Sequence, residues 1–125
     1  MATIALSEQT FPETVRRDGI VMVDFWAAWC GPCRAFGPVF EAASEDHPDI
    51  VFGKVDTEAE PGLSGSLRIM SIPTLMIFRD GILVFEQPGA QPAAALAKLI
   101  GAVRELDMEA IRQELAAAGT TAEPS

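Results

Sequence analysis

The sequence has no long hydrophobic run and few basic residues, and each shortage excludes a class of protein. Although 49% of its 125 residues are hydrophobic, no uninterrupted apolar stretch approaches the ~20 residues that cross a bilayer. Nine lysines and arginines stand against 18 aspartates and glutamates, which gives a net charge of -9. Because that charge repels phosphate backbones and anionic lipids, we expect the protein to bind neither nucleic acids nor membranes.

Cysteine and histidine are also scarce. Two cysteines, Cys30 and Cys33, are too few for a disulfide framework, and residues 1–8 lack the basic start and apolar core of a signal peptide. We therefore expect a cytoplasmic protein, in which such a closely spaced pair is more often catalytic or metal-binding than structural. A zinc site needs four ligands, whereas the chain offers two cysteines and His47, so we expect no metal ion.

Hydrophobic patterns predict five strands. Their expected positions are residues 3–6, 20–26, 50–55, 74–78 and 82–85. The runs at 20–26 and 74–78 are almost continuously apolar, as in strands buried on both faces at the centre of a sheet. Asp80-Gly81 between the last two runs indicates an antiparallel hairpin.

Helices fit between these strands, so the order of elements predicts an α/β sandwich. The first helix is expected to begin near Thr10, and the second to run from 31 to about 45 with a bend near Pro38. A weak third helix is expected at 58–68, and the last two should follow Pro92 and Asp107. Thr10 and Glu13 match a capping box for the first helix, which should end by Gly19. Asp107 should cap the last helix. The apolar stripe of that helix consists of Met108, Ile111 and Leu115.

The chemistry is expected at residues 29–33, Trp-Cys-Gly-Pro-Cys, which follow the most apolar strand and open a helix. Cys30 should lie at the helix N-terminus, where free N–H groups and the helix dipole favour the thiolate that attacks disulfides. Cys33 lies one turn further on, close enough to form a disulfide, and should be screened while Cys30 is exposed. Gly31 lets a partner's backbone approach, and Pro32 suits the first helical turn.

Residues 23–34, Val-Asp-Phe-Trp-Ala-Ala-Trp-Cys-Gly-Pro-Cys-Arg, resemble the active-site signature of bacterial thioredoxins. Residues 71–74 and 88–90 resemble two further hallmarks of that family, and the similarity covers roughly residues 3–106. The resemblance implies a thioredoxin fold, with a central mixed five-stranded sheet flanked by helices on both faces. It also implies reduction of protein disulfides and re-reduction by an NADPH-dependent thioredoxin reductase. We expect no bound cofactor, since no Gly-rich phosphate loop follows a strand.

Asp24 and Lys54 are candidates for proton transfer. Asp24 lies within a strand expected to be buried, where an unpaired carboxyl is costly and its pKa should rise. From the pattern alone it could equally be a satisfied polar residue at the strand's edge; the resemblance implies that it accepts the proton of Cys33. Lys54 either reaches solvent or, as the resemblance implies, lies near Asp24 and tunes its titration.

The resemblance also implies a docking patch for substrates. It predicts a cis peptide bond before Pro73, which is otherwise uncommon, and leaves the Ile72 backbone free to pair with an extended substrate. Trp26 is expected to pack beneath the site. The implied substrate-binding residues are Trp29, Gly31, Pro32, Ile72, Pro73, Gly89 and Ala90.

Two other functions stay open at this point. A disulfide oxidant or isomerase of the same fold usually carries a histidine between the cysteines and a secretory signal, and this chain has neither. A non-catalytic adaptor would need neither both cysteines nor Asp24. The chain also departs from the family pattern at Leu67, where an aromatic residue is common, and at Gly62 and Gly65. These changes should affect local stability rather than chemistry.

The domain organisation follows from these observations. We expect a thioredoxin domain at 1–106, a C-terminal extension at 107–118 that forms a short surface helix, and a flexible tail at 119–125. We also expect a monomer.

Overall fold

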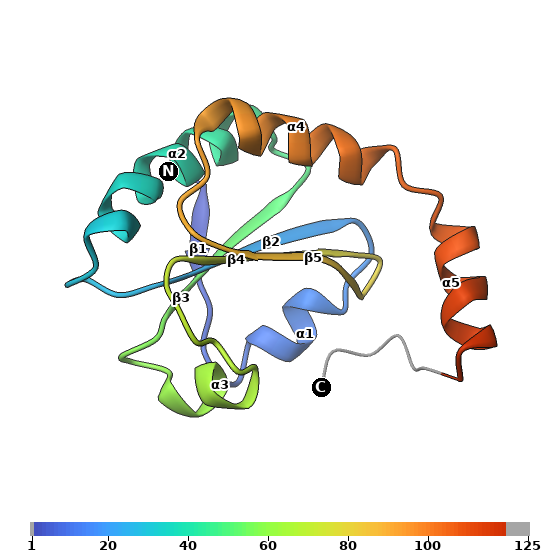
Figure 1. Ribbon diagram of the computed structural model, residues 1–125, viewed down its shortest axis with the longest axis horizontal. Helices are drawn as coiled ribbons and strands as arrows, with labels where there is room; N and C mark the ends of the chain where they lie inside the picture. The colour runs from blue at the N-terminus through green and yellow to red at the C-terminus, as the bar shows by residue number, and fades with distance from the viewer. Residues whose placement is uncertain (1, 120–125) are drawn as a thin grey trace.

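The computed structural model describes residues 2–119 and arranges five strands in one mixed sheet (Figure 1). The strands are β1 (Thr3–Ala5), β2 (Ile20–Trp26), β3 (Val51–Asp56), β4 (Thr74–Arg79) and β5 (Ile82–Pro88). Their order across the sheet is β1-β3-β2-β4-β5. β3 runs parallel to β1 and β2, whereas β4 is antiparallel to both β2 and β5. The prediction of a mixed five-stranded sheet is therefore confirmed.

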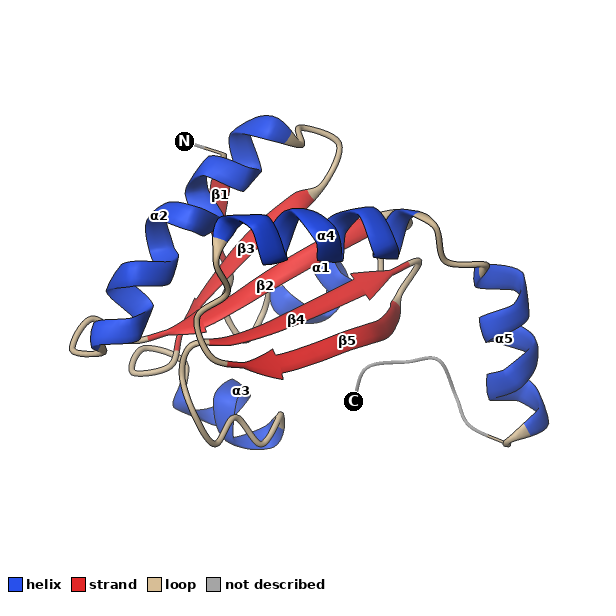
Figure 2. Ribbon diagram, turned by 45° about the horizontal axis from the view of Figure 1, so that its top comes forward, coloured by secondary structure: helices blue, strands red, loops and turns tan. Residues whose placement is uncertain are grey.

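Helices cover both faces of this sheet. They are α1 (Phe11–Val15), α2 (Gly31–Asp46), α3 (Pro61–Ser66), α4 (Ala93–Arg104) and α5 (Met108–Ala117). Figures 1 and 2 show α2 and α4 on one face, α1 and α3 on the other, and α5 standing beyond the end of the sheet. This arrangement confirms the predicted sandwich.

Each face of the sheet has its own hydrophobic core. On one face, Phe36 and Phe40 of α2 pack with Leu96 of α4, and the Phe40 ring lies 5.1 Å from that of Phe52 in β3. On the other, Phe11 of α1 contacts the rings of Phe25 and Phe78 at 6.2 and 6.0 Å. β2 and β4 can lie at the centre because their side chains are apolar on both faces.

The hairpin between β4 and β5 forms where the Asp-Gly pair predicts it. Asp80 and Gly81 both adopt left-handed backbone conformations, with φ of 53° and 82°, as a tight hairpin turn requires. Asp80 Oδ1 accepts a hydrogen bond of 2.9 Å from the backbone N–H of Gly19. The turn is thereby tied to the start of β2.

The predicted capping box at Thr10 is wrong. Thr10 has helical φ and ψ angles, and its side chain makes no capping hydrogen bond to α1. Its Oγ1 instead accepts a hydrogen bond of 2.9 Å from the N–H of Ser7. The Thr10 hydroxyl, which a capping box would require, is therefore engaged in the turn at residues 7–10. The helix α1 spans only Phe11–Val15.

Two other elements differ in length from their predicted bounds. α3 spans Pro61–Ser66 rather than 58–68, since Asp56 Oδ1 accepts hydrogen bonds from the N–H groups of Glu58 and Ala59 and holds that segment in a turn. β5 continues to Pro88, beyond the predicted end at 85, because its pairing with β4 extends to Thr74.

The last helix begins as the sequence predicts. Asp107 caps α5, with Oδ1 accepting from the N–H of Ala110 at 3.1 Å. Met108 is buried, whereas Ile111 and Leu115 are half-buried. The domain boundary at 106 stays a prediction. Among residues 2–119, no helix combines the length and apolar character that crossing a membrane needs.

Arg79 connects the hairpin to the link between α4 and α5. Its Nη1 donates to the carbonyl oxygens of Val103 and Leu106 at 2.8 and 2.9 Å, and to that of Arg104 at 3.3 Å. Carbonyls at the end of a helix have few partners within the helix. The guanidinium supplies a donor to those of Arg104 and Leu106 and a second donor to that of Val103, which also accepts from the N–H of Leu106 at 3.3 Å.

We expect Arg79→Ala to destabilise the protein by about 1–3 kcal/mol, because it removes charge-assisted hydrogen bonds to several carbonyls at once. Arg79→Lys should lose less, since a lysine keeps the charge. Arg112→Ala, which removes an exposed arginine whose contacts are with Glu109 and Asp80, is the matched control and should cost under about 1 kcal/mol. Urea unfolding measures all three; equal stability of Arg79→Ala and the unsubstituted protein would contradict this account.

Candidate active site

Cys30 and Cys33 are joined by a disulfide at the start of α2. Cys30 caps the helix in an extended conformation, with φ of -86° and ψ of 116°, and the two Cα atoms are 5.2 Å apart. The backbone N–H of Cys33 donates to Cys30 Sγ over 3.2 Å. The Cys30 sulfur thus lies at the positive end of the helix dipole, where a thiolate is stabilised.

The two cysteines are equally covered, which corrects the expectation that only Cys30 is exposed. Each is 4% exposed, and both belong to a small buried cluster with Ala27. The partly buried side chains of Ile72 and Trp26 pack against this cluster. The cysteines are distinguished by position rather than exposure, because only the Cys30 sulfur receives a helix N–H group.

The loop before β4 lies directly against the disulfide. The Ile72–Pro73 peptide bond is cis, as the resemblance implies, and the carbonyl oxygen of Ile72 is 3.6 Å from Cys30 Sγ. Thr74 Oγ1 donates to the carbonyl of Ser71 at 2.6 Å, and Gly89 N–H donates to that of Pro73 at 2.8 Å. Gly89 has φ of 102°, a conformation that favours glycine. The loops at 71–74 and 88–90 therefore meet beside the cysteines.

Asp24 is completely buried in β2, and neither of its carboxylate oxygens has a hydrogen-bond partner among the described residues. Burial raises the pKa of this carboxyl from 3.8 to about 7, because loss of water disfavours the charged form; the charge of Lys54 opposes this rise. The alternative of a satisfied polar residue at the strand's edge is thus wrong. Asp24 is able to hold or release a proton near neutral pH.

Lys54 lies beside Asp24 on the neighbouring strand. The two residues are paired in the register of β2 and β3, and Lys54 is half-buried. Its Nζ lies 5.1 Å from the centre of the Trp26 ring, within the range of a cation–π contact. Lys54 therefore does not simply extend into solvent, and Trp26 contacts both this ammonium group and the cysteine cluster.

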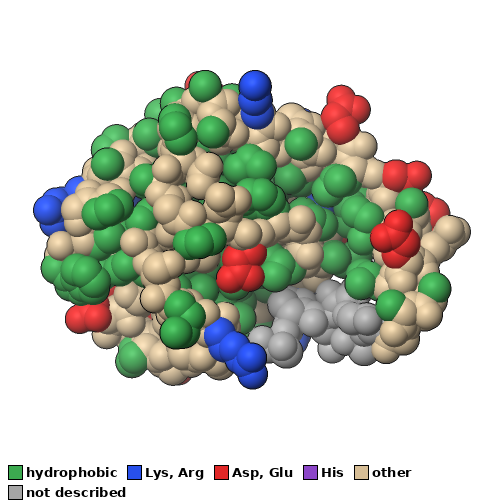
Figure 3. Space-filling model, viewed as in Figure 1, with side chains coloured by type: hydrophobic (Ala, Val, Ile, Leu, Met, Phe, Trp, Pro, Cys, Tyr) green, Lys and Arg blue, Asp and Glu red, His purple; other side chains and the backbone are tan. Residues whose placement is uncertain are grey.

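The remaining predicted site residues form an open surface around the disulfide. Trp29 is 67% exposed, Ile72 is half-buried and Pro73 is buried. The exposed members are Gly31, Pro32, Gly89 and Ala90. Figure 3 shows hydrophobic side chains at the left end of the molecule, where β2 leads into α2 in the same view. Their binding roles stay predictions.

Sequence reasoning missed two features of this region. Arg34 Nη1 donates to the carbonyl of Ala28 at 2.9 Å and so braces the turn that carries the cysteines. Met70 is 91% exposed, two residues before Ile72. The sequence did contain a signal for each feature. Arg34 directly follows the second cysteine, and Met70 is an apolar residue in a loop next to a hallmark motif.

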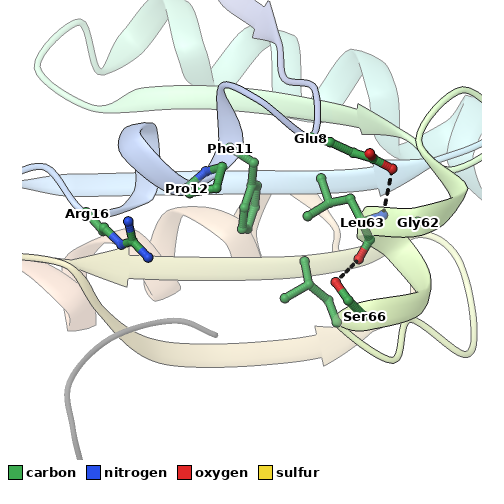
Figure 4. Close-up of a pocket in the computed structure, with 8 residues that line it drawn as sticks. Glu8, Phe11, Pro12, Arg16, Gly62, Leu63 and Ser66 are labelled. Atoms are coloured by element: carbon green, nitrogen blue, oxygen red, sulfur yellow. Dashed lines mark hydrogen bonds between the residues drawn. The ribbon is translucent and has the colours of Figure 1, made fainter.

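A separate pocket of about 490 Å³ lies between α1 and α3, away from the cysteines (Figure 4). Phe11, Leu63 and Leu67 are among its lining. Glu8 Oε1 accepts from the N–H of Leu63 at 3.1 Å, and a Cβ at Gly62 would lie 2.5 Å from that oxygen. The chain's departures from the family pattern at 62 and 67 thus line this pocket and leave the cysteine site unaltered.

A disulfide-bonded cysteine pair at a helix start, on a sheet of this topology, is the arrangement of a thiol–disulfide oxidoreductase. Residues 2–102 match the family model described as Thioredoxin. The chain belongs to the thioredoxin family. Membership implies disulfide-containing proteins as substrates and a reductase as partner.

Relatives with known sequences support this assignment. The chain is 54% identical over 115 residues to a protein named putative thioredoxin 2 from Streptomyces coelicolor, covering 92% of this chain and 86% of the relative. It is 42% identical to a thioredoxin of Alicyclobacillus acidocaldarius, covering 76% of this chain and 91% of the relative. A match over 92% of the chain reaches into α5, past the end of the family model at 102.

Solved structures agree with the fold. Malassezia sympodialis thioredoxin superposes with a TM-score of 0.72 at 31% identity, covering 81% of this chain and 93% of that one. Plasmodium falciparum thioredoxin gives the same TM-score at 33% identity, covering 79% of this chain and 96% of that one.

The raised pKa of Asp24 makes stability depend on pH. In the native state the carboxyl keeps its proton up to about pH 7, whereas the unfolded chain releases it near 3.8. The resulting destabilisation is absent below 3.8, grows as the pH rises, and is complete above 7, where it reaches roughly 4 kcal/mol. We expect the stability gain of Asp24→Asn to increase steadily between about pH 4 and pH 8.

Denaturant unfolding at several pH values measures this gain. Asp18→Asn, at an exposed aspartate, controls for the loss of a surface charge. A gain from Asp24→Asn that does not change with pH, or a loss at high pH, would show that the carboxyl is not destabilising in its ionised form.

Proposed function

We propose that this protein reduces disulfides of other proteins in the cytoplasm, acting as a monomer that an NADPH-dependent thioredoxin reductase re-reduces. The observation that carries the proposal is a disulfide-bonded cysteine pair at a helix N-terminus with a carboxyl of pKa about 7 buried in the adjoining strand. Such a group can accept a proton at physiological pH without remaining permanently ionised.

Cys30 performs the first step. In the reduced protein its thiolate attacks one sulfur of the substrate disulfide, which forms a mixed disulfide and releases the other substrate sulfur as a thiolate. The helix N-terminus supports this choice, because it stabilises negative charge on Cys30 in particular.

Cys33 completes the reaction. Its thiol gives a proton to Asp24, directly or through a water molecule, and the resulting thiolate attacks Cys30 Sγ. The second substrate sulfur then leaves as a thiolate, and the Cys30–Cys33 disulfide forms. Two electrons have passed from the protein to the substrate.

Lys54 and the exposed surface play supporting roles. The Lys54 ammonium keeps the pKa of Asp24 from rising further, so that the carboxylate is available as proton acceptor. An extended substrate segment pairs with the Ile72 backbone, next to the Cys30 sulfur, and rests on Trp29. The remaining docking residues are Gly31, Pro32, Pro73, Gly89 and Ala90.

An insulin-reduction assay tests the function, first with dithiothreitol and then with thioredoxin reductase and NADPH as electron source. We expect turnover with both. Activity with dithiothreitol alone would contradict the proposed partner, and no activity with either would favour an adaptor. A redox potential near those of disulfide-forming enzymes would favour an oxidant instead.

We expect Cys33→Ser to trap substrates as mixed disulfides through Cys30, because the resolving thiolate is missing. Cys30→Ser should neither trap substrates nor reduce them. Non-reducing gels and intact-mass measurement detect the adducts after mixing with oxidised insulin. Trapping by Cys30→Ser to the same extent would reverse the assignment of nucleophile and resolving cysteine.

Removal of α5 should leave the chemistry intact. A chain that ends at Leu106 loses the buried Met108 and two half-buried apolar residues but no group of the proposed mechanism. We expect it to fold, to lose at most a few degrees in melting temperature, and to keep most of its activity. Unchanged melting with strongly altered turnover by thioredoxin reductase would instead identify α5 as a docking element.

A further inference from the structure

Met70 is the most exposed of the large hydrophobic side chains among residues 2–119. Only four such side chains are prominently exposed in that part of the chain: Ile4 at 47%, Trp29 at 67%, Met70 at 91% and Leu83 at 41%. A single exposed apolar residue needs no explanation. Two of these four, however, are close along the chain to the cysteine site: Trp29 precedes Cys30, and Met70 comes two positions before Ile72, which packs against the cysteine cluster.

The backbone around Met70 is held on both sides. Before it, the N–H groups of Arg68 and Ile69 donate to the carbonyls of Gly65 and Ser64, each at 3.0 Å. Ile69 packs against the core beneath the sheet. After it, the carbonyl of Ser71 accepts from the Thr74 hydroxyl. The segment therefore presents Met70 to solvent without being a loose loop, which lowers the entropy lost when a partner binds.

Met70 is also within reach of a substrate bound at the disulfide. Two residues of chain span at most about 7.6 Å between Cα atoms, so the Met70 backbone lies close to Ile72. The carbonyl of Ile72 is 3.6 Å from Cys30 Sγ, which marks the place of the attacked disulfide. A substrate segment that pairs with Ile72 and continues along the loop toward Met70 meets it within a few residues of the substrate's own cysteine.

We propose that Met70 is a specificity residue of this site, and that it contacts apolar side chains located within a few positions of the substrate's disulfide. The inference rests on the proposed function. Methionine suits this role because its unbranched, flexible side chain adapts to apolar groups of different shape, as at other surfaces that bind many partners. In this role Met70 adds an exposed apolar side chain to those of Trp29 and Ile72.

The test compares two peptides that carry the same internal disulfide. Residues flanking the disulfide within two positions are leucine in one peptide and serine in the other. The reduced protein is mixed with each, and the second-order rate constant is measured. We expect the leucine peptide to react about three- to tenfold faster, which corresponds to partial burial of one apolar side chain.

Substitutions at Met70 should change this ratio. Met70→Ser should lower it at least about threefold, while Met70→Leu, which keeps an apolar side chain, should retain it. Leu83→Ser is the matched control, because Leu83 is an exposed apolar residue near the start of β5. The cysteines lie near the other end of β5. In the register of the sheet, Phe25 at the end of β2 is opposite Thr74 of β4, and Thr74 is opposite Pro88 at the end of β5. Leu83→Ser should leave the ratio unchanged.

Bis(2-hydroxyethyl) disulfide, a small neutral substrate, separates the two possible failures. If the unsubstituted protein does not reduce it, the proposed reductase chemistry is wrong. If the protein reduces this compound but Met70→Ser shows the same peptide ratio as the unsubstituted protein, or Leu83→Ser lowers the ratio equally, only the inference about Met70 is overturned. Melting curves of the variants confirm that each is folded.

Discussion

A carboxyl group buried at the centre of the sheet, with no hydrogen-bond partner among residues 2–119, is the constraint on which the rest of this structure depends. Asp24 is held there because β2 is paired on both sides, with Lys54 of β3 and Leu75 of β4 as its neighbours. Burial opposes ionisation, and the charge of Lys54 limits that opposition, so the carboxyl has a pKa of about 7. The free-energy cost of burying this carboxyl would be harder to offset with a hydrophobic core on one face of the sheet alone. Here a core on each face of the sheet supports β2.

The features that stabilise the fold and those that carry the chemistry lie at opposite ends of the sheet. β2 leads into α2 at the disulfide, and the loops before β4 and after β5 meet there. At the other end, Asp80 binds the N–H of Gly19, and Arg79 fixes the link between α4 and α5. The contacts that anchor these elements therefore involve none of the residues around the cysteine turn. α5, which lies past the end of the family model at residue 102, is likewise at the end of the sheet away from the site.

Sequence patterns predict those parts of the structure that short-range interactions determine. The central strands, the start of α2, the Asp80-Gly81 turn and the Asp107 cap each follow from residues within a few positions. The capping box failed because Ser7, outside the motif, competes for the Thr10 hydroxyl. The equal burial of both cysteines depends on Ile72, some 40 positions away, and no local pattern contains it. The cis bond was predictable only by resemblance, since the residues before Pro73 give no other signal.

Most of the residues that surround the buried disulfide are themselves exposed, and this matches a protein substrate better than a small molecule. The pocket between α1 and α3 is enclosed by Phe11 and Leu63 and contains none of the predicted site residues. An extended segment of another protein needs an apolar and firmly held surface, which is the role proposed for Trp29, Ile72 and Met70. Such a surface would also favour contact between two copies of the chain. The net charge of -9 opposes that contact through long-range repulsion, so the acidic composition offsets the risk of self-association that the exposed apolar patch creates.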